Sequence, residues 1–179
     1  MEQIKSILVE VQIAKILASI FLIAIGIPLL LGMLLGIPLT SILSFIGSIA
    51  IFQALAAPVG VILDFEPWVV LSIMTCFAFG ICLAIWESLQ TFALTSERVN
   101  LWIGGIEQKM QEHQSLHRYG PVSCILIAWI PGIGLYGTPA IAWILRWDRI
   151  PSVIFTVTGF FIASFLMMIL AEGASIIIG

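Results

Sequence analysis

The chain has 179 residues, of which 61% are hydrophobic and only 9% are charged. Soluble domains carry about 25% charged residues, so a soluble protein of this composition would lack the polar coat that its core needs. The apolar residues also form unbroken blocks instead of an amphipathic pattern, which indicates an integral membrane protein. The net charge of −3 argues against nucleic acid as a partner.

At the start of the chain, residues 1–15 have an amphipathic pattern. Their apolar residues share one face of a helix, and their polar residues occupy the opposite arc. The pattern predicts a helix that lies at the membrane interface and leads into a first span over residues 16–32. Glu2 and Glu10 interrupt the basic region that a cleaved signal would have, so we expect this segment to be retained.

The basic residues predict the topology. Four uncharged blocks each reach the roughly 20 residues that cross a bilayer core as a helix, namely residues 16–63, 67–86, 119–145 and 150–171. Basic residues stand on both sides of the third block, with Arg98, Lys109 and Arg118 before it and Arg146 and Arg149 after it. Because basic connections face the cytoplasm, we expect the third block to enter the membrane and return to the same side.

The first block is expected to combine a crossing with a hairpin. Residues 16–63 are too few for three crossings and too many for one. We therefore expect the span 16–32, a re-entrant hairpin over residues 33–63 that enters from the outer side, and a span over residues 67–88. Helix-breaking residues mark this hairpin, namely Gly36, Pro38, Gly47, Pro58 and Gly60. We expect its tip near Gly47.

The second half repeats this plan in the opposite orientation. Residues 96–118 predict an interfacial helix on the cytoplasmic side, followed by a re-entrant hairpin over residues 119–145 that turns at residues 131–134, and by a span over residues 150–171. The fold class is therefore a single all-α integral membrane domain, with an inverted repeat of re-entrant hairpin plus transmembrane helix and an additional N-terminal span. Interrupted apolar segments in two inverted halves point to a transport site near the midplane. The alternative is that the hairpins only let helices pack closely.

The candidate substrate-binding residues are uncharged polar and turn-forming residues of the two hairpins. The first hairpin supplies Pro38, Ser41, Ser44 and Gln53, and the second supplies Pro131, Gly132, Gly134, Tyr136, Gly137 and Thr138. An interhelical hydrogen bond is the alternative role of the polar members. We expect no catalytic residue, metal or cofactor, because His113 and His117 lie in the polar connection and the three cysteines lie inside apolar blocks, where packing is their usual use.

The second hairpin carries the most distinctive motifs, which are Tyr119-Gly120, Pro131-Gly132-x-Gly134, Gly137 and Ala142-Trp143. On these motifs, residues 118–149 resemble the hallmark of an archaeal and bacterial family described as small multidrug export proteins. More distantly, the chain is similar to the DedA superfamily, also called VTT-domain proteins, in which two facing re-entrant hairpins pack among spans. The resemblance implies transport or scrambling of a lipid or lipid-linked substrate. Ala128 and Gly134 stand where DedA proteins typically carry arginines.

The sequence therefore predicts a small transporter or a lipid scramblase or flippase in the cell membrane, with its N-terminus in the cytoplasm and its C-terminus outside. The expected partner is a membrane lipid or an amphiphilic small molecule, and self-association into a homo-oligomer is left open. The alternative is a non-transporting membrane subunit or assembly factor that packs against a partner protein. An enzyme is not expected, because no Ser/His pair, carboxylate pair or metal set falls within the apolar blocks.

Overall fold

The structure is a computed structural model that describes residues 2–95, 114–130 and 132–178. All regular elements within these ranges are helical. In chain order they are α1 (Glu2–Ala18), the π-helical segment η1 (Ser19–Gly26), α2 (Ile27–Leu34), α3 (Leu39–Phe52), the 3₁₀ segment η2 (Gln53–Ala56), α4 (Ala57–Ile62), α5 (Pro67–Thr95), α7 (Gln114–Ile127), α8 (Gly134–Ile144) and α9 (Arg149–Ile178).

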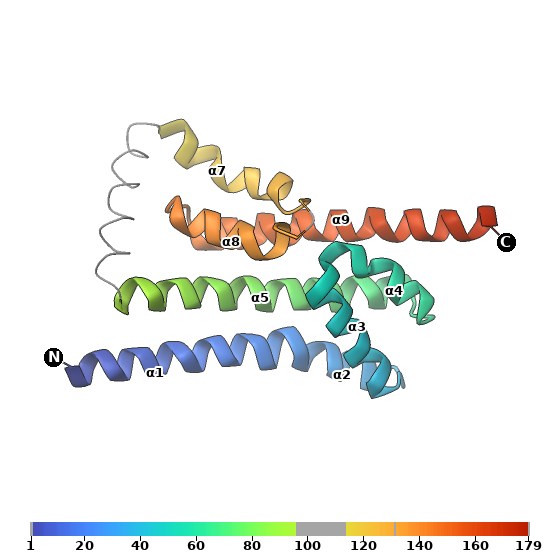
Figure 1. The fold of residues 1–179 in the computed structure, drawn as a ribbon, viewed down its shortest axis with the longest axis horizontal. Coiled ribbons are helices and arrows are strands. Elements are labelled where there is room, and N and C mark those ends of the chain that lie inside the picture. Colours follow the sequence, from blue (N-terminus) through green and yellow to red (C-terminus); the bar gives the residue numbers. More distant parts are fainter. Residues whose placement is uncertain (1, 96–113, 131, 179) are drawn as a thin grey trace.

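Four apolar helical segments are long enough to cross a membrane, namely Glu10–Leu34, Leu39–Ile62, Pro67–Ala93 and Arg149–Ala171. By this length and composition the chain is a membrane protein. Its outer surface carries large apolar side chains such as those of Leu34 and Ile62. The second segment differs from the other three, because its helix reverses direction at η2 (Figure 1).

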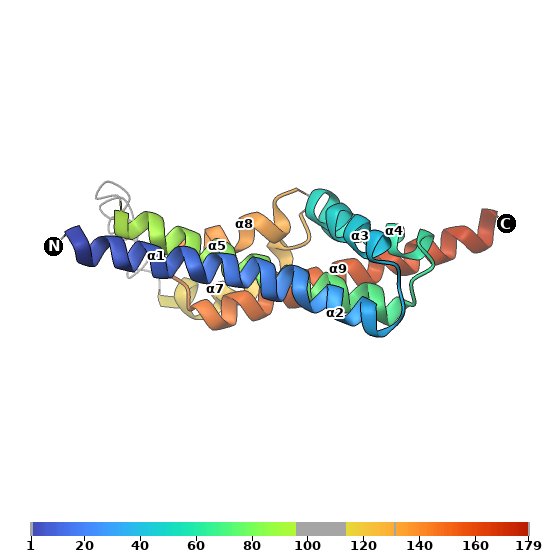
Figure 2. The same cartoon turned by 90° about the horizontal axis from the view of Figure 1, so that it is seen from below.

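Three long helical rods lie side by side along the molecule (Figures 1 and 2), and they are α1–η1–α2, α5 and α9. Helix α5 contacts both η1 and α9. Two shorter helix pairs lie at opposite ends of these rods. Helices α3 and α4 join the rods at the end where α2 stops and α5 begins, whereas α7 and α8 start and finish near the opposite end (Figure 1). Each pair turns back part-way along the rods.

The buried core draws on both helix pairs and on all three rods. The first rod contributes the buried Ala24 and Pro28. Most of the large, fully buried side chains come from α3, α5, α8 and α9, and include Ile42, Phe45, Ile49, Val70, Ile73, Met74, Leu135 and Phe160. A second cluster lies between α5, α7 and the end of α8, and consists of Trp86, Cys124, Ala142, Trp143 and Trp147.

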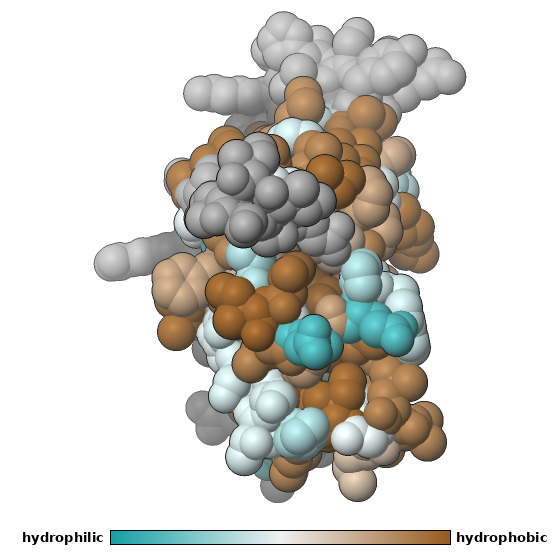
Figure 3. Space-filling model, turned by 90° about the vertical axis from the view of Figure 1, so that its right-hand side faces the viewer, coloured by the Kyte–Doolittle hydropathy of each residue, from teal (hydrophilic) through white to brown (hydrophobic). Residues whose placement is uncertain are grey.

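Figure 3 views the end of the molecule at which α4 joins α5. Hydrophilic residues occupy only a small area there, among apolar side chains. The exposed carboxylates Asp64 and Glu66 belong to the α4–α5 connection, and the indole N–H of Trp68 donates a hydrogen bond to the Glu66 carboxylate. Such a narrow polar area on an apolar body fits one end of a bundle of membrane helices.

The two helix pairs end in turns with the same hydrogen-bond pattern. After α4, Asp64 has a φ of 59°, and the N–H of Phe65 donates to the carbonyl five residues earlier, at 3.1 Å. After α8, Arg146 has a φ of 56°, and the N–H of Trp147 makes the equivalent bond at 3.0 Å. Both are Schellman motifs, which pair the last carbonyls of a helix and are usually accompanied by an apolar residue at the position of Phe65 and Trp147.

These two aromatic residues fasten each pair to its own first helix. The Phe65 ring packs edge-on against Phe45 of α3, with ring centroids 5.6 Å apart and planes at 90°. The Trp147 ring lies against Gly120 of α7, where an added Cβ would overlap the indole. The end of each hairpin is therefore held where the next long helix begins.

Three details of the fold differ from the sequence expectations or lie beyond the described residues. Helix α1 continues through η1 to Leu34 (Figure 1), so no break marks the expected boundary between an interfacial helix and a span at residue 15. The first hairpin turns at η2 and not near Gly47, which lies inside α3, because glycine is ordinary within membrane helices. Residues 96–113 of the expected interfacial helix, including His113, lie outside the described ranges, and residues 114–118 begin α7.

Two glycines allow close contact between the rods and their neighbours. A Cβ added at Gly80 of α5 would lie 2.6 Å from the backbone nitrogen of Ala24 in η1. A Cβ added at Gly159 of α9 would lie 2.5 Å from the carbonyl oxygen of Ile125 in α7. Small residues at such positions let membrane helices approach closely.

Gly159→Ala tests this contact, with Gly47→Ala as its matched control. The added methyl group at Gly159 meets backbone, so α7 and α9 must separate, and we expect a loss of about 1–3 kcal/mol in the free energy of unfolding. A Cβ at Gly47 meets nothing within 4 Å, so that variant should be no less stable than the parent. Unfolding of the purified proteins in one detergent, followed by circular dichroism, measures both. Equal midpoints for the two variants would contradict the α7–α9 contact.

Candidate functional site

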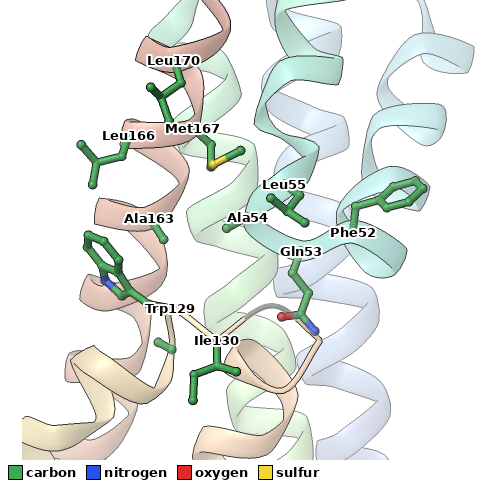
Figure 4. A pocket seen from close by; sticks show the side chains of 11 residues that line it. Phe52, Gln53, Ala54, Leu55, Trp129, Ile130, Ala163, Leu166, Met167 and Leu170 are labelled. Carbon is green, nitrogen blue, oxygen red and sulfur yellow. The ribbon is translucent and has the colours of Figure 1, made fainter.

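The turns of the two helix pairs meet part-way along the molecule. The amide oxygen Oε1 of Gln53, at the end of α3, accepts a hydrogen bond from the N–H of Leu135 at 3.3 Å. The Tyr136 hydroxyl donates to the carbonyl of Ala50 at 2.5 Å. Figure 4 shows the Gln53 amide reaching toward the connection between α7 and α8. Two segments more than 80 residues apart in the sequence are thereby joined.

These two bonds cap helix ends. Leu135 lies in the first turn of α8, where N–H groups have no acceptor within the helix. Ala50 lies in the last turn of α3, where carbonyls have no helical donor. The negative end of the α3 dipole therefore meets the positive end of the α8 dipole, which is a favourable arrangement. Each turn supplies the partner that the other one lacks.

Gln53 has an unusual backbone for its residue type. Its φ of 55° and ψ of −127° match the first central position of a type II′ turn, at about 60° and −120°, where glycine is the usual residue. A side chain in this region costs roughly 1–3 kcal/mol, and such strain gathers at functional sites. The residue is also only 4% exposed. A buried polar group with a strained backbone at the tip of the hairpin marks Gln53 as the central residue of the site.

The second turn is tight for a different reason. Gly132 has a φ of 85°, and the N–H of Gly134 donates to the carbonyl of Ile130 at 2.7 Å. A Cβ at Gly134 would collide with the carbonyl oxygen of Ala128, while the buried Thr138 hydroxyl donates to the carbonyl of Gly134 itself. A substitution at Gly134 would therefore disturb the fold of this turn.

A pocket of about 220 Å³ lies beside the two turns. It is walled by the first turn, the second turn and α9, and its lining residues are Phe52, Gln53, Ala54, Leu55, Ala128, Trp129, Ile130, Ala163, Leu166, Met167 and Leu170 (Figure 4). None of these residues is charged. Leu55 and Trp129 are exposed on opposite sides of the pocket, so its rim is apolar and open to the surroundings of the helices.

The structure describes nine of the ten predicted site residues, and they fall into three groups. Gln53 lines the pocket, and Tyr136 joins the two turns. The second-hairpin residues Gly132, Gly134, Gly137 and Thr138 shape the tight turn and the start of α8, and Pro131 lies outside the described residues.

The remaining three predicted site residues lie elsewhere. Pro38 precedes α3, Ser41 is in its first turn, and the carbonyl of Ser44 accepts the hydroxyl of Ser48 at 2.9 Å. None of them lines the pocket. They were expected close to a tip near Gly47, whereas α3 runs on to Phe52.

Sequence reasoning did not find the wall that α9 contributes. Ala163, Leu166 and Met167 are ordinary apolar residues of a membrane helix, and nothing in their spacing separates a pocket wall from a lipid-facing surface. Trp129 was missed for the same reason. Only the fold brings them to the turns.

An ion pair between two long helices was also missed. Arg149 Nη2 lies 2.7 Å from Oε1 of Glu87, which joins the start of α9 to the second half of α5. Glu87 is 4% exposed, and its other oxygen Oε2 has no hydrogen-bond partner among the described residues. Both residues flank apolar blocks, but the sequence gives no signal that they meet.

These features define an all-helical membrane protein whose most distinctive site is a small, uncharged pocket between two broken helices. Among the residues that the structure describes, no group of three or more His, Cys, Asp or Glu side chains could hold a metal ion. Comparison with protein families, with curated proteins and with solved structures found no match. The resemblance to small multidrug export and DedA proteins stays a prediction from the motifs of residues 118–149.

Gln53→Ala and Gln53→Gly test the strain at the first turn. Both variants lose the amide that caps α8 and differ only in the Cβ. We expect the glycine variant to be more stable by about 1 kcal/mol, because glycine adopts positive φ without a steric penalty. Equilibrium unfolding of both purified variants in the same detergent measures this difference. An alanine variant at least as stable as the glycine variant would show that the turn carries no strain.

Proposed function

We propose that the protein is a small membrane transporter or lipid scramblase that moves a lipid-linked or amphiphilic molecule past the two hairpin turns. The observation that carries this proposal is the pocket between the turns, with its apolar rim and the single amide of Gln53 in its wall. A polar group beside a laterally open apolar cavity suits a molecule that has both kinds of surface.

The arrangement of the helices supports re-entrant hairpins. Helices α3 and α4 begin and end at one end of the rods, and α7 and α8 at the other (Figure 1). With 14 residues, α3 is about 21 Å long at roughly 1.5 Å per residue, which takes it past the middle of a hydrocarbon core of about 30 Å. If the rods cross the bilayer, each pair enters from one face and returns to it, and the turns meet near the midplane.

The matching turns support an inverted repeat. Each hairpin is followed by a Schellman motif, a buried aromatic residue and an acidic residue whose backbone carbonyl accepts the first hydrogen bond of the next long helix. Val70 N–H donates to the Glu66 carbonyl at 3.1 Å, and Ser152 N–H donates to the Asp148 carbonyl at 3.1 Å. The two units run in opposite directions along the rods (Figure 1). In transporters, inverted repeats with interrupted helices place the substrate near the bilayer centre.

The chemistry of the pocket favours an amphiphile over an ion. A pore for ions would use rings of charged side chains or aligned carbonyls, and none of the described residues that line this pocket is charged. Access from the side also suits a molecule that arrives within the bilayer. We propose that the N-terminus and the Arg146 connection face the cytoplasm, which puts Asp64 and the C-terminus on the outer side.

Ala163→Leu tests the path by filling the pocket from α9, with Ala171→Leu on the same helix as control, since Ala171 does not line the pocket. A molecule that must pass the filled pocket would meet an overpacked site, which costs about 1–3 kcal/mol. If this cost is added to the barrier, the transport rate should fall roughly 5- to 150-fold. The rate is measured in liposomes with fluorescent lipids, both phosphate-bearing and neutral, and an impermeant quencher. Unaltered transport by a folded Ala163→Leu variant removes the pocket from the path. A parent protein that moves no lipid but purifies with a stoichiometric partner would favour the non-transporting subunit.

Glu66→Cys and Asp148→Cys test the topology in a background that lacks Cys76, Cys82 and Cys124. Both positions are exposed and lie in the two matching connections. An impermeant maleimide added to intact cells should label the first variant and reach the second only after permeabilisation. Labelling of both from the same side would exclude the inverted arrangement.

A further inference from the structure

The composition of the pocket wall narrows the class of molecule that it can hold. Apart from the Trp129 indole, Gln53 is the only side chain among the described lining residues with an N–H or O–H group, and none of these residues is charged. A phosphate or carboxylate moved into such a surrounding would lose its hydration without gaining a cation or several N–H donors in return, which is costly.

The hydrogen bond from Leu135 fixes what Gln53 can offer. Because a backbone N–H can only donate, the amide atom facing α8 must be the oxygen, and the NH₂ group is the other end of the amide. That nitrogen makes no hydrogen bond with the described residues. The site therefore presents a neutral donor, which pairs with an acceptor oxygen such as an ester carbonyl and makes no demand for charge.

The size of the pocket limits how much of a ligand's apolar chain it can hold. A volume of about 220 Å³ is below the roughly 300–1,000 Å³ of pockets that enclose drug-sized ligands. The pocket can hold a part of one hydrocarbon chain of the ligand. The rest of that hydrocarbon chain would extend out through the open rim between Leu55 and Trp129. A second chain has no room beside the first.

We infer that this pocket binds an uncharged amphiphile with a single hydrocarbon chain, in preference to phosphate-bearing lipids. The ligand has an acceptor oxygen where its head group joins its hydrocarbon chain. This inference rests on the proposed function. The Gln53 amide nitrogen donates to that oxygen, and the chain lies along Ala163 and Met167 of α9. An acylglycerol with one chain has this chemistry, and the corresponding lysophosphatidic acid differs from it only by its phosphate.

Quenching of tryptophan fluorescence by brominated chains measures this binding without any transport. The purified full chain is titrated with a monoacylglycerol and with a lysophosphatidic acid that carry the same brominated chain, and the Trp129→Phe variant is titrated in parallel, because Trp129 is one of six tryptophans. We expect saturable quenching by the monoacylglycerol that depends on Trp129, and binding of the lysophosphatidic acid that is at least about tenfold weaker, since burying its charge is costly.

Two variants test the pocket itself. Gln53→Leu should weaken monoacylglycerol binding roughly three- to tenfold, the equivalent of one neutral hydrogen bond. Ala163→Leu keeps the amide but fills the pocket, so it should remove the saturable quenching even if Gln53→Leu fails to fold. Equal binding of both lipids, an unchanged affinity of folded Gln53→Leu, or equal quenching in Trp129→Phe would each overturn the inference. A protein that binds monoacylglycerol selectively but moves no lipid refutes the proposed function alone.

Discussion

A broken helix in a hydrocarbon surrounding must find partners for the peptide groups that the break frees, because lipid offers none. In this protein the two breaks supply those partners to each other. The Gln53 amide accepts the Leu135 N–H at the start of α8, and the Tyr136 hydroxyl donates to the Ala50 carbonyl at the end of α3. Each turn thus pairs a helix-end group of the other, which stabilises the contact between the two hairpins, and the pocket lies beside that contact.

The outer ends of the hairpins are fixed by packing, which leaves the tips to be positioned by these few bonds. The Phe65–Phe45 contact holds the first hairpin, and Trp147 against Gly120 holds the second. Helix α9 then runs past both tips and closes one side of the pocket with small and flexible residues, Ala163 and Met167. The site is thus a product of three segments that are far apart in the chain.

Much of the element plan could be predicted from the sequence, because unbroken apolar blocks and clustered breakers have few structural solutions in a bilayer. The long helix α5 begins at Pro67, α9 begins two residues before Pro151, and the break between α7 and α8 falls at its glycines. The first turn was misplaced, since its break is made by Gln53, a residue that carries no turn signal, while Gly47 continues the helix.

The contacts that complete the site could not be predicted. They join Gln53 to Leu135 and Ala163 to both turns, and they depend on how the rods are placed next to one another. Hydropathy does not reveal this placement, because the lining of the pocket and the lipid-facing surface consist of the same types of apolar residue.

The ion pair of Glu87 with Arg149 also bears on how the chain is assembled. Glu87 lies near the end of α5, and its partner arrives only with α9, after the entire second hairpin has been synthesised. Until Arg149 has been synthesised, the Glu87 carboxylate lacks this partner, and an unpaired carboxylate among apolar neighbours is costly. The Glu87–Arg149 pair can therefore form only after α9 has been made, so this ion pair joins α5 to the last helix to be added to the bundle.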